Sequence, residues 1–365
     1  MTTPLQMASV NTENISITRL SQLIPTNEKS TPPTWKKLKN QWNDTPSSDY
    51  AFSVPFQCFT QKSANQFKKI CETYYHSNNE YHTERTSACL RGCKKLEQAV
   101  FKCKKGLELV ASKLVGIPLK LHNMNYEWAH INVQRTVQSN PVDNWHQDSM
   151  PYVLVTVLTN HVEDEGGSLV VRPIVHDEIE YSNNNSNSNS NSNSISNEKP
   201  FHELPKNLLM CKLKYPGESV LVQGSQIWHK AEPSQIGERL TMVTSFVPES
   251  CYVYDSSSIR IAVQYTPPSK CIHQFLNHVM LRLKRVQKND ESDTVTKEIV
   301  KVITAMKEIQ KIISYDNNKK NSNCELIQAF EKWASINHAL GMWLKIRLKN
   351  KNVKQVRNTI ENSKL

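Results

Sequence analysis

The chain has 365 residues, of which 38% are hydrophobic and 22% charged, and its formal net charge is +11. This length suits one large catalytic domain with an accessory module, or two ordinary domains. The longest apolar runs fall well short of the roughly 18 residues that a transmembrane helix needs, which excludes an integral membrane protein of the helical kind. The first residues lack a basic segment followed by an apolar one, so we expect no secretory signal and a cytoplasmic location, with the nucleus as the alternative.

The positive charge is concentrated near the C-terminus. From Leu281 onward there are 18 Lys and Arg against 9 Asp and Glu, a net of +9, whereas the rest of the chain has 27 against 25, a net of +2. Lysines spread around amphipathic helices usually form a solvated face, and no interleaved aromatic residues indicate a stacking platform for nucleic acid. Binding of nucleic acid is therefore not expected. Packing on the rest of the chain, or a homodimer through the apolar stripe from Val295 to Ile313, is favoured.

The nine cysteines show no paired spacing. Cys89 and Cys93 lie one helical turn apart, but no CxxC motif or nearby pair of histidines completes a zinc site. We interpret the cysteines as reduced thiols of a protein from a reducing compartment.

In chain order, residues 1–48 are rich in Thr, Ser, Asn and Pro and predict a flexible leader. Phe52, Val54 and Phe56 alternate as in a strand. Apolar residues at helical spacing then predict one helix over 63–75 and a second over 86–114.

Strand patterns dominate the middle of the chain. They cover 128–133, 152–158, 168–171, 219–222, 226–228 and 240–247. Short strands separated by turns, with helices outside them, predict a mainly β sandwich or barrel of antiparallel strands over 49–262. Residues 181–199 are dominated by Asn and Ser and predict a surface loop insertion. Helical patterns at 272–288, 294–314 and 324–348 predict a basic helical extension over 263–365.

A candidate metal site begins directly before the strand YVLVTVL. Ferrous iron in oxygenases is held by two histidines and one carboxylate on one face, which leaves three positions open. His146 and Asp148 are two residues apart, so in a strand both side chains point to the same face. His229 follows a later apolar segment and is the candidate third ligand.

Arg239 opens the strand RLTMVTSFV, ten residues after His229. In a strand, Arg239 and Thr241 share a face. A buried guanidinium beside a hydroxyl suits the distal carboxylate of 2-oxoglutarate, which arginine can bind with two parallel hydrogen bonds.

The order His-x-Asp, then a distant His, then Arg and a hydroxyl two residues beyond resembles the Fe(II)/2-oxoglutarate-dependent dioxygenases. The stretch from 118 to 248, with PLKLHNMNYEWAHIN, DNWHQDS, a Gly-Gly turn and ERLTMVTSFVP, resembles uncharacterised fungal members in particular. The resemblance covers about residues 50–260 and implies a double-stranded β-helix, or jelly roll, with the helical extension following it. It implies Fe(II) on His146, Asp148 and His229, and 2-oxoglutarate held by Arg239 with help from Thr241 and Asn132.

Three other His-x-acid patterns compete with this one: His82-Thr83-Glu84, His161-Val162-Glu163 and His176-Asp177-Glu178. His146 differs from them because it enters an apolar strand and has a correctly placed His and Arg downstream, whereas His161 lies in a polar segment that reads as a turn. Relatives that halogenate have a small residue in place of the carboxylate, so Asp148 favours hydroxylation or a related oxidation of a C–H bond.

The expected activity is thus oxidation of a small-molecule substrate with succinate and carbon dioxide as co-products. Two alternatives stay open. One is a hydroxylase of protein or nucleic acid that recruits its substrate through the basic helices. The other is a catalytically silent binding protein with the same fold.

Overall fold

The computed structural model describes residues 5–23, 47–77, 88–135, 145–161, 166–172, 209–235, 237–251, 253, 255–257, 268–289, 300 and 303. The chain divides into two compact units, Met1–Glu249 with Val253–Thr266, and Ser250–Tyr252 with Pro267–Leu365. No helix in the described ranges combines the length and the apolar character needed to cross a bilayer.

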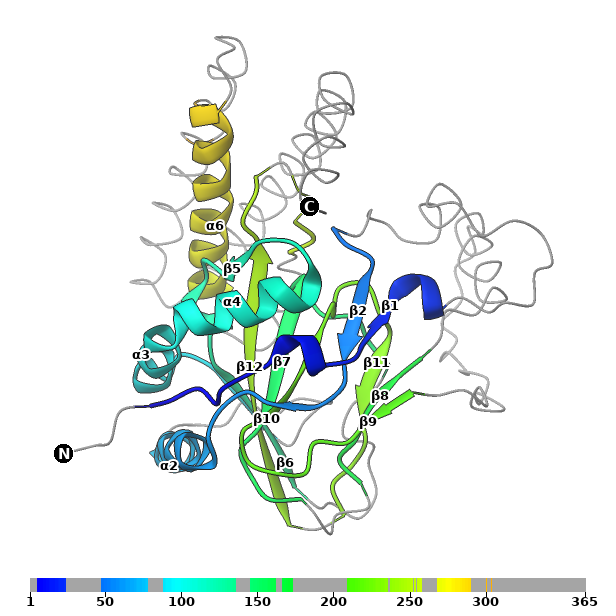
Figure 1. Ribbon diagram of the computed structural model, residues 1–365. Coiled ribbons are helices and arrows are strands. Elements are labelled where there is room, and N and C mark those ends of the chain that lie inside the picture. The colour runs from blue at the N-terminus through cyan, green and yellow to red at the C-terminus, as the bar shows by residue number, and fades with distance from the viewer. Residues whose placement is uncertain are drawn as a thin grey trace, which may run out of the picture. The chain divides into compact units, whose positions relative to one another are not determined.

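The first unit is mainly β, as the sequence predicted, and its strands form two sheets (Figure 1). The large sheet has the order β1-β2-β10-β7-β12-β6-β4, with β3 paired to β10 and β5 paired to β12. The small sheet has the order β11-β8-β9, and every strand pair in the two sheets is antiparallel. The large sheet contains β1 (Ile17–Arg19), β2 (Tyr50–Ser53), β3 (Phe56–Gln57), β4 (Ala88–Leu90), β5 (Leu119–Leu121), β6 (His130–Arg135), β7 (Tyr152–Val157), β10 (Glu218–Val222) and β12 (Glu238–Pro248). The small sheet contains β8 (Leu169–Val171), β9 (Leu209–Cys211) and β11 (His229–Ala231).

Within the described ranges, three α-helices accompany the large sheet: α2 (Gln61–Ser77), α3 (Lys94–Lys102) and α4 (Lys104–Val115). Helix α2 confirms the first predicted helix. The second prediction, one helix over 86–114, is wrong in its first part, where the chain forms β4 and pairs with β6. Gly92 has a φ of 82°, a left-handed conformation that ends the strand and separates it from α3. Short 3-10 helices lie in the described part of the unit at Thr12–Asn14, Leu20–Leu23 and Asn125–Glu127.

Strand β12 lies between β6 and β7 and has two different faces. Leu240, Met242 and Phe246 are buried in one hydrophobic cluster with Leu96 of α3 and Leu107 of α4. Burying each such side chain contributes about 1.5–3 kcal/mol, so this face anchors the sheet to the helices. Because side chains alternate along a strand, the other face carries Arg239, Thr241, Val243 and Ser245. We call this the polar face.

The N-terminal segment differs from the predicted leader. Residues 5–23 include β1, which pairs with β2, and the fully buried Leu20. Apolar residues in this segment, among them Leu5, Met7 and Ile17, pack against the hydrophobic cluster. This packing holds the segment in a defined conformation, which its polar composition does not predict.

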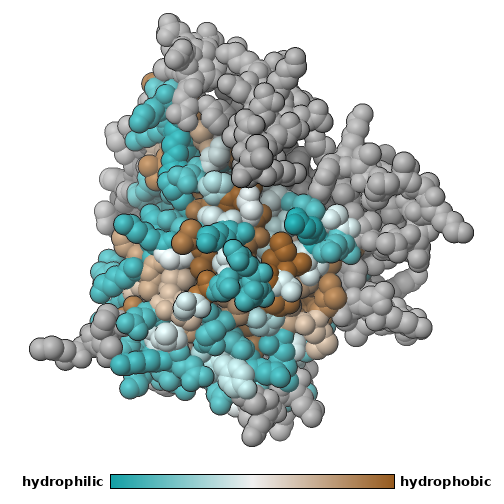
Figure 2. Space-filling model, viewed as in Figure 1, coloured by the Kyte–Doolittle hydropathy of each residue, from teal (hydrophilic) through white to brown (hydrophobic). Residues whose placement is uncertain are grey.

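The face of the molecule drawn in Figure 2 shows hydrophobic residues gathered together and surrounded by hydrophilic ones.

In the second unit, α6 (Pro268–Asn289) coincides with the predicted helix over 272–288. The other two predicted C-terminal helices, the dimer stripe and the Asn/Ser insertion lie outside the described residues, apart from Val300 and Ile303. The boundary expected at 262/263 lies outside them as well. No cysteine of the described part forms a disulfide, and burial raises the pKa of the Cys58 thiol to about 12.

Candidate metal centre

His146 and His229 come together through their backbones. Each backbone N–H donates to the other residue's carbonyl oxygen at 3.0 Å, which forms an isolated antiparallel bridge at the start of β11. Residues that face each other in an antiparallel pair direct their side chains to the same side. The two imidazole centroids are accordingly 4.4 Å apart, with the rings tilted by 52°.

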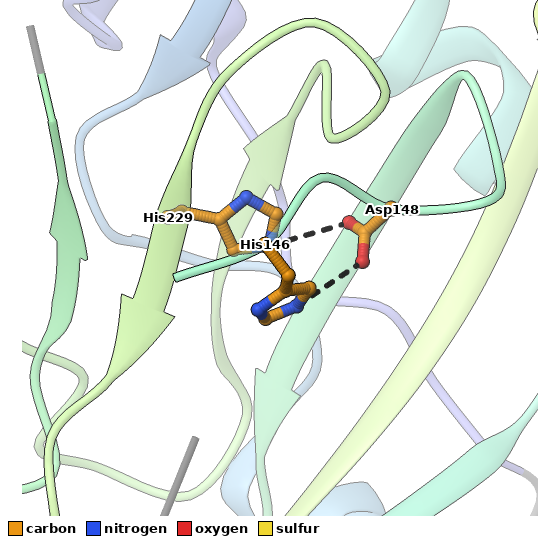
Figure 3. Close-up of side chains that lie close together, drawn as sticks. All are labelled: His146, Asp148 and His229. Carbon is orange, nitrogen blue, oxygen red and sulfur yellow. Dashed lines mark ion pairs between the residues drawn. The ribbon is translucent and has the colours of Figure 1, made fainter. Parts of the chain in front are cut away.

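Asp148 joins the two histidines from the same segment as His146. Its Oδ1 lies 3.6 Å from His146 Nε2 and its Oδ2 lies 3.4 Å from His229 Nε2 (Figure 3). One ligand atom from each of the three residues lies within 4.8 Å of the others. The structure therefore brings all three predicted ligands to one point, although His229 belongs to a strand far along the chain.

Gly224, just after β10, allows Asp148 to take this position. The backbone N–H of Asp148 donates to the Gly224 carbonyl at 2.9 Å. A Cβ built on Gly224 would overlap the Asp148 carboxylate. Gly224 is needed here for close approach, and its functional relevance was missed in the sequence.

The imidazole of His229 is oriented by the main chain. Its Nδ1 lies 3.1 Å from the carbonyl oxygen of Ile227. A carbonyl oxygen only accepts, so Nδ1 carries a proton and donates it, which leaves Nε2, the nitrogen beside Asp148, as the one that can bind a metal. Such a partner on the far nitrogen is the usual way in which a metal-binding histidine is held in the ligating tautomer.

The geometry and chemistry of the three residues fit a divalent transition metal. Such a metal lies about 2.1 Å from imidazole nitrogen and carboxylate oxygen, so two of these atoms at right angles around it are about 3.0 Å apart. The two distances found here are slightly wider, so a bound metal would draw the side chains together by only a small amount. Burial disfavours the charge of Asp148, but the two imidazoles outweigh it and hold the pKa of that carboxyl well below its usual range.

The polar face of β12 carries the other predicted site residues. Arg239 and Thr241 are each 3% exposed, and in the strand register Thr241 lies directly across from Asn132 of β6. Arg239 lies directly across from Gln134, whose Oε1 accepts a hydrogen bond from Arg239 Nη1 at 3.3 Å. The structure thus brings Arg239, Thr241 and Asn132 to one face, and it adds Gln134, which the sequence reasoning missed.

A buried charged cluster, Arg91, Glu127 and His130, was also missed. Arg91 Nε lies 3.6 Å from one Glu127 oxygen, and His130 Nδ1 lies 3.7 Å from the other. Ser245 of the polar face donates to that second oxygen at 3.4 Å. Burial alone would raise the pKa of Glu127, but Arg91 and His130 lower it to about 2. Burial and the charge of Arg91 lower the pKa of His130, against the opposing effect of Glu127.

Of the competing patterns, only His161 lies among the described residues. It is buried, and its Nε2 lies 2.6 Å from the hydroxyl of Thr159. It is therefore a core histidine with a hydrogen bond and not the solvated turn residue that the sequence suggested. His82 and His176 fall outside the described ranges.

No model of a protein family matches the chain, and no curated protein matches its sequence. Among solved structures, the chain is similar to the non-heme α-ketoglutarate-dependent carbocyclase SnoK from nogalamycin biosynthesis, at 13% identity over 61% of this chain and 86% of that one, with a TM-score of 0.37. It is also similar to HygX from Streptomyces hygroscopicus with nickel and 2-oxoglutarate bound, at 14% identity over 55% and 83%, with a TM-score of 0.35. A third similar structure is the non-heme monooxygenase ThoJ in its nickel complex, at 14% identity over 66% and 96%, with a TM-score of 0.35. At such low identities and TM-scores the likeness establishes neither the fold nor the activity of this chain.

Proposed function

We propose that the chain is an Fe(II)- and 2-oxoglutarate-dependent oxygenase. The observation that carries the proposal is the convergence of His146, Asp148 and His229 on one point. Two imidazoles and one carboxylate on one side of a metal are the ligand set of ferrous oxygenases, and they leave positions open for a chelating co-substrate and dioxygen. We further propose that the two antiparallel sheets form a double-stranded β-helix around this point.

In this proposal Arg239 binds the distal carboxylate of 2-oxoglutarate. The guanidinium is buried, so its charge-assisted hydrogen bonds to a carboxylate are little screened by water. Thr241, on the same face, offers a hydroxyl donor, and Asn132 offers an amide opposite it. Asp148, His146 and His229 hold the metal, and the Ile227 carbonyl keeps His229 in the ligating tautomer.

Ferrous iron bound there would supply the activation of dioxygen, coupled to decarboxylation of 2-oxoglutarate to succinate. The chain's own contribution is to hold the open coordination face and to exclude bulk water from it. The side chains of His229, His146 and Asp148 are only 7%, 11% and 24% exposed, respectively, which limits the access of water to the metal. Because Asp148 retains its carboxylate, we propose hydroxylation or a related oxidation of a C–H bond.

We propose a small molecule as the primary substrate. On the side of β6 and β7 that shares the polar face of β12, Asn132 and Val155 are half-buried and the largely buried His130 side chain retains 13% exposure, whereas Val153, Val157 and Gln134 beside them are buried. This group offers a small surface that joins an imidazole, an amide and an aliphatic side chain. A compact substrate with both polar and apolar parts suits it.

The test is formation of succinate by the purified full-length protein with Fe(II), ascorbate and 2-oxoglutarate. We expect slow turnover without a primary substrate, and none above background in His146→Ala. Release of succinate at equal rates by the two proteins would refute the activity. If neither protein releases succinate and neither binds a divalent metal, the alternative of a catalytically silent binding protein is favoured.

A further inference from the structure

Gln134 is a hydrogen-bond partner of the buried arginine on the polar face. It lies on β6, is 3% exposed, and faces Arg239 directly in the antiparallel register with β12. Its Oε1 accepts a hydrogen bond from Arg239 Nη1 at 3.3 Å. Ordering and burying two long polar side chains costs free energy, so packing alone does not explain why this pair is present.

The chemistry of the two groups fixes the orientation of the amide. A guanidinium has five N–H donors and no acceptor, so the oxygen of Gln134 must face Arg239 and its NH2 group must face away. Among the described residues, Nε2 of Gln134 has no hydrogen-bond partner, and it is not among the fully enclosed polar atoms that lack one. Two further N–H donors are therefore presented beside the guanidinium.

The partner is also an amide and not a carboxylate. A glutamate at this position would form an ion pair with Arg239 and compete with any bound anion for its charge. A neutral oxygen restrains the guanidinium without neutralising it. Restraint by a neutral group is compatible with a carboxylate that binds the same guanidinium.

We infer that Gln134 is a positioning residue for the carboxylate clamp: it orients Arg239 and supplies a second donor for the distal carboxylate of 2-oxoglutarate. This inference rests on the proposed function. It makes the clamp a cross-strand pair from β6 and β12. Binding of a 2-oxo acid that lacks the distal carboxylate should not depend on Gln134.

The experiment measures dissociation constants by calorimetry on full-length protein loaded with Mn2+ in place of iron. The variants are Gln134→Met, which keeps the unbranched shape, and Gln134→Glu, which adds the competing charge. We expect Gln134→Met to weaken 2-oxoglutarate binding about tenfold, as the loss of one hydrogen bond to a charged group implies, and Gln134→Glu to weaken it more. Binding of Mn2+ and of pyruvate, which keeps the 2-oxo acid but lacks the distal carboxylate, should be unchanged.

Thr244→Val is the matched control, because Thr244 is fully buried on the opposite face of β12 and its hydroxyl has no hydrogen-bond partner in the described part. It should bind 2-oxoglutarate like the unchanged protein. If Gln134→Met does not fold, Gln134→Leu takes its place. If the Gln134 variants bind 2-oxoglutarate as tightly as the unchanged protein, the inference fails while the proposed function stands. The same holds if the variants lose affinity for 2-oxoglutarate and for pyruvate to the same degree. Binding of Mn2+ without any binding of 2-oxoglutarate by the unchanged protein would overturn the proposed function with it.

Discussion

The carboxylate of Asp148 occupies the space in which a side chain of Gly224 would lie, and the two residues are also joined by a backbone hydrogen bond of 2.9 Å. The carbonyl of Gly224 fixes the backbone of Asp148, and the absence of a Cβ gives its carboxylate room to face both histidines. A residue that binds no metal itself therefore determines where a ligand lies.

The first prediction concerns Gly224→Ala. The added methyl group must displace the Asp148 carboxylate, so affinity for Mn2+ should fall by about 10- to 100-fold, the usual effect of disturbing a residue that supports a metal ligand. Calorimetric titration with Mn2+ measures it. Gly116→Ala is the control, because nothing lies within 4 Å of the added Cβ there and only its left-handed backbone is strained. Similar losses in both variants would show that Gly224 matters for folding in general.

The second prediction concerns the charge of Arg239. In Arg239→Lys the positive charge remains, but the planar group that binds a carboxylate through two parallel hydrogen bonds is lost. Binding of 2-oxoglutarate to the Mn2+-loaded protein should weaken at least about tenfold, while binding of Mn2+ stays the same. Full retention of 2-oxoglutarate affinity would mean that the charge alone suffices, or that Arg239 is not the clamp.

The third prediction concerns Arg91→Met. Glu127 is 2% exposed and Arg91 10% exposed, so removing the guanidinium leaves a buried carboxylate without its main counter-charge. Breaking a buried pair in this way costs about 3–5 kcal/mol. Urea unfolding followed by circular dichroism measures the change. The double variant Arg91→Met, Glu127→Gln should recover part of the loss, and a loss in the single variant of the size typical of surface positions would contradict the burial of this pair.

The fourth prediction concerns pH. The pKa of Glu127 is lowered to about 2 in the folded chain, so its charged form stabilises the fold. The contribution is fully present above the unfolded-state pKa near 4.5 and is lost as the pH falls toward 2. Its size is on the order of 3 kcal/mol. Between about pH 5 and about pH 3, the free energy of unfolding should therefore fall more steeply for the unchanged protein than for Glu127→Gln. Parallel curves would show that Glu127 is not ionised in the fold.

The ligand set could be predicted from the sequence because its members follow simple spacing rules. His146 and Asp148 lie two residues apart, and Arg239 and Thr241 likewise lie two apart on one face of β12. Residues whose role depends on contact across the fold left no such signal. Gly224 looks like any turn glycine until Asp148 is placed beside it, and Gln134 looks like a strand residue until it is paired with Arg239.

The elements that were predicted wrongly are short or depend on distant partners. Strand β4 has only three residues, too few to show the alternation of a strand. The N-terminal segment is ordered by packing on the hydrophobic cluster, which local composition does not reveal. The cluster around Glu127 was missed because a buried charge can be recognised only together with its counter-charge.

The most direct test of the central claim is anaerobic equilibrium dialysis of the purified chain against Fe(II), with and without 2-oxoglutarate. We predict one ferrous ion bound per chain, tighter binding when 2-oxoglutarate is present, and loss of that ion in His146→Ala and in His229→Ala while both variants stay folded. Ferrous iron bound equally well by the unchanged chain and by folded His229→Ala would contradict the metal centre.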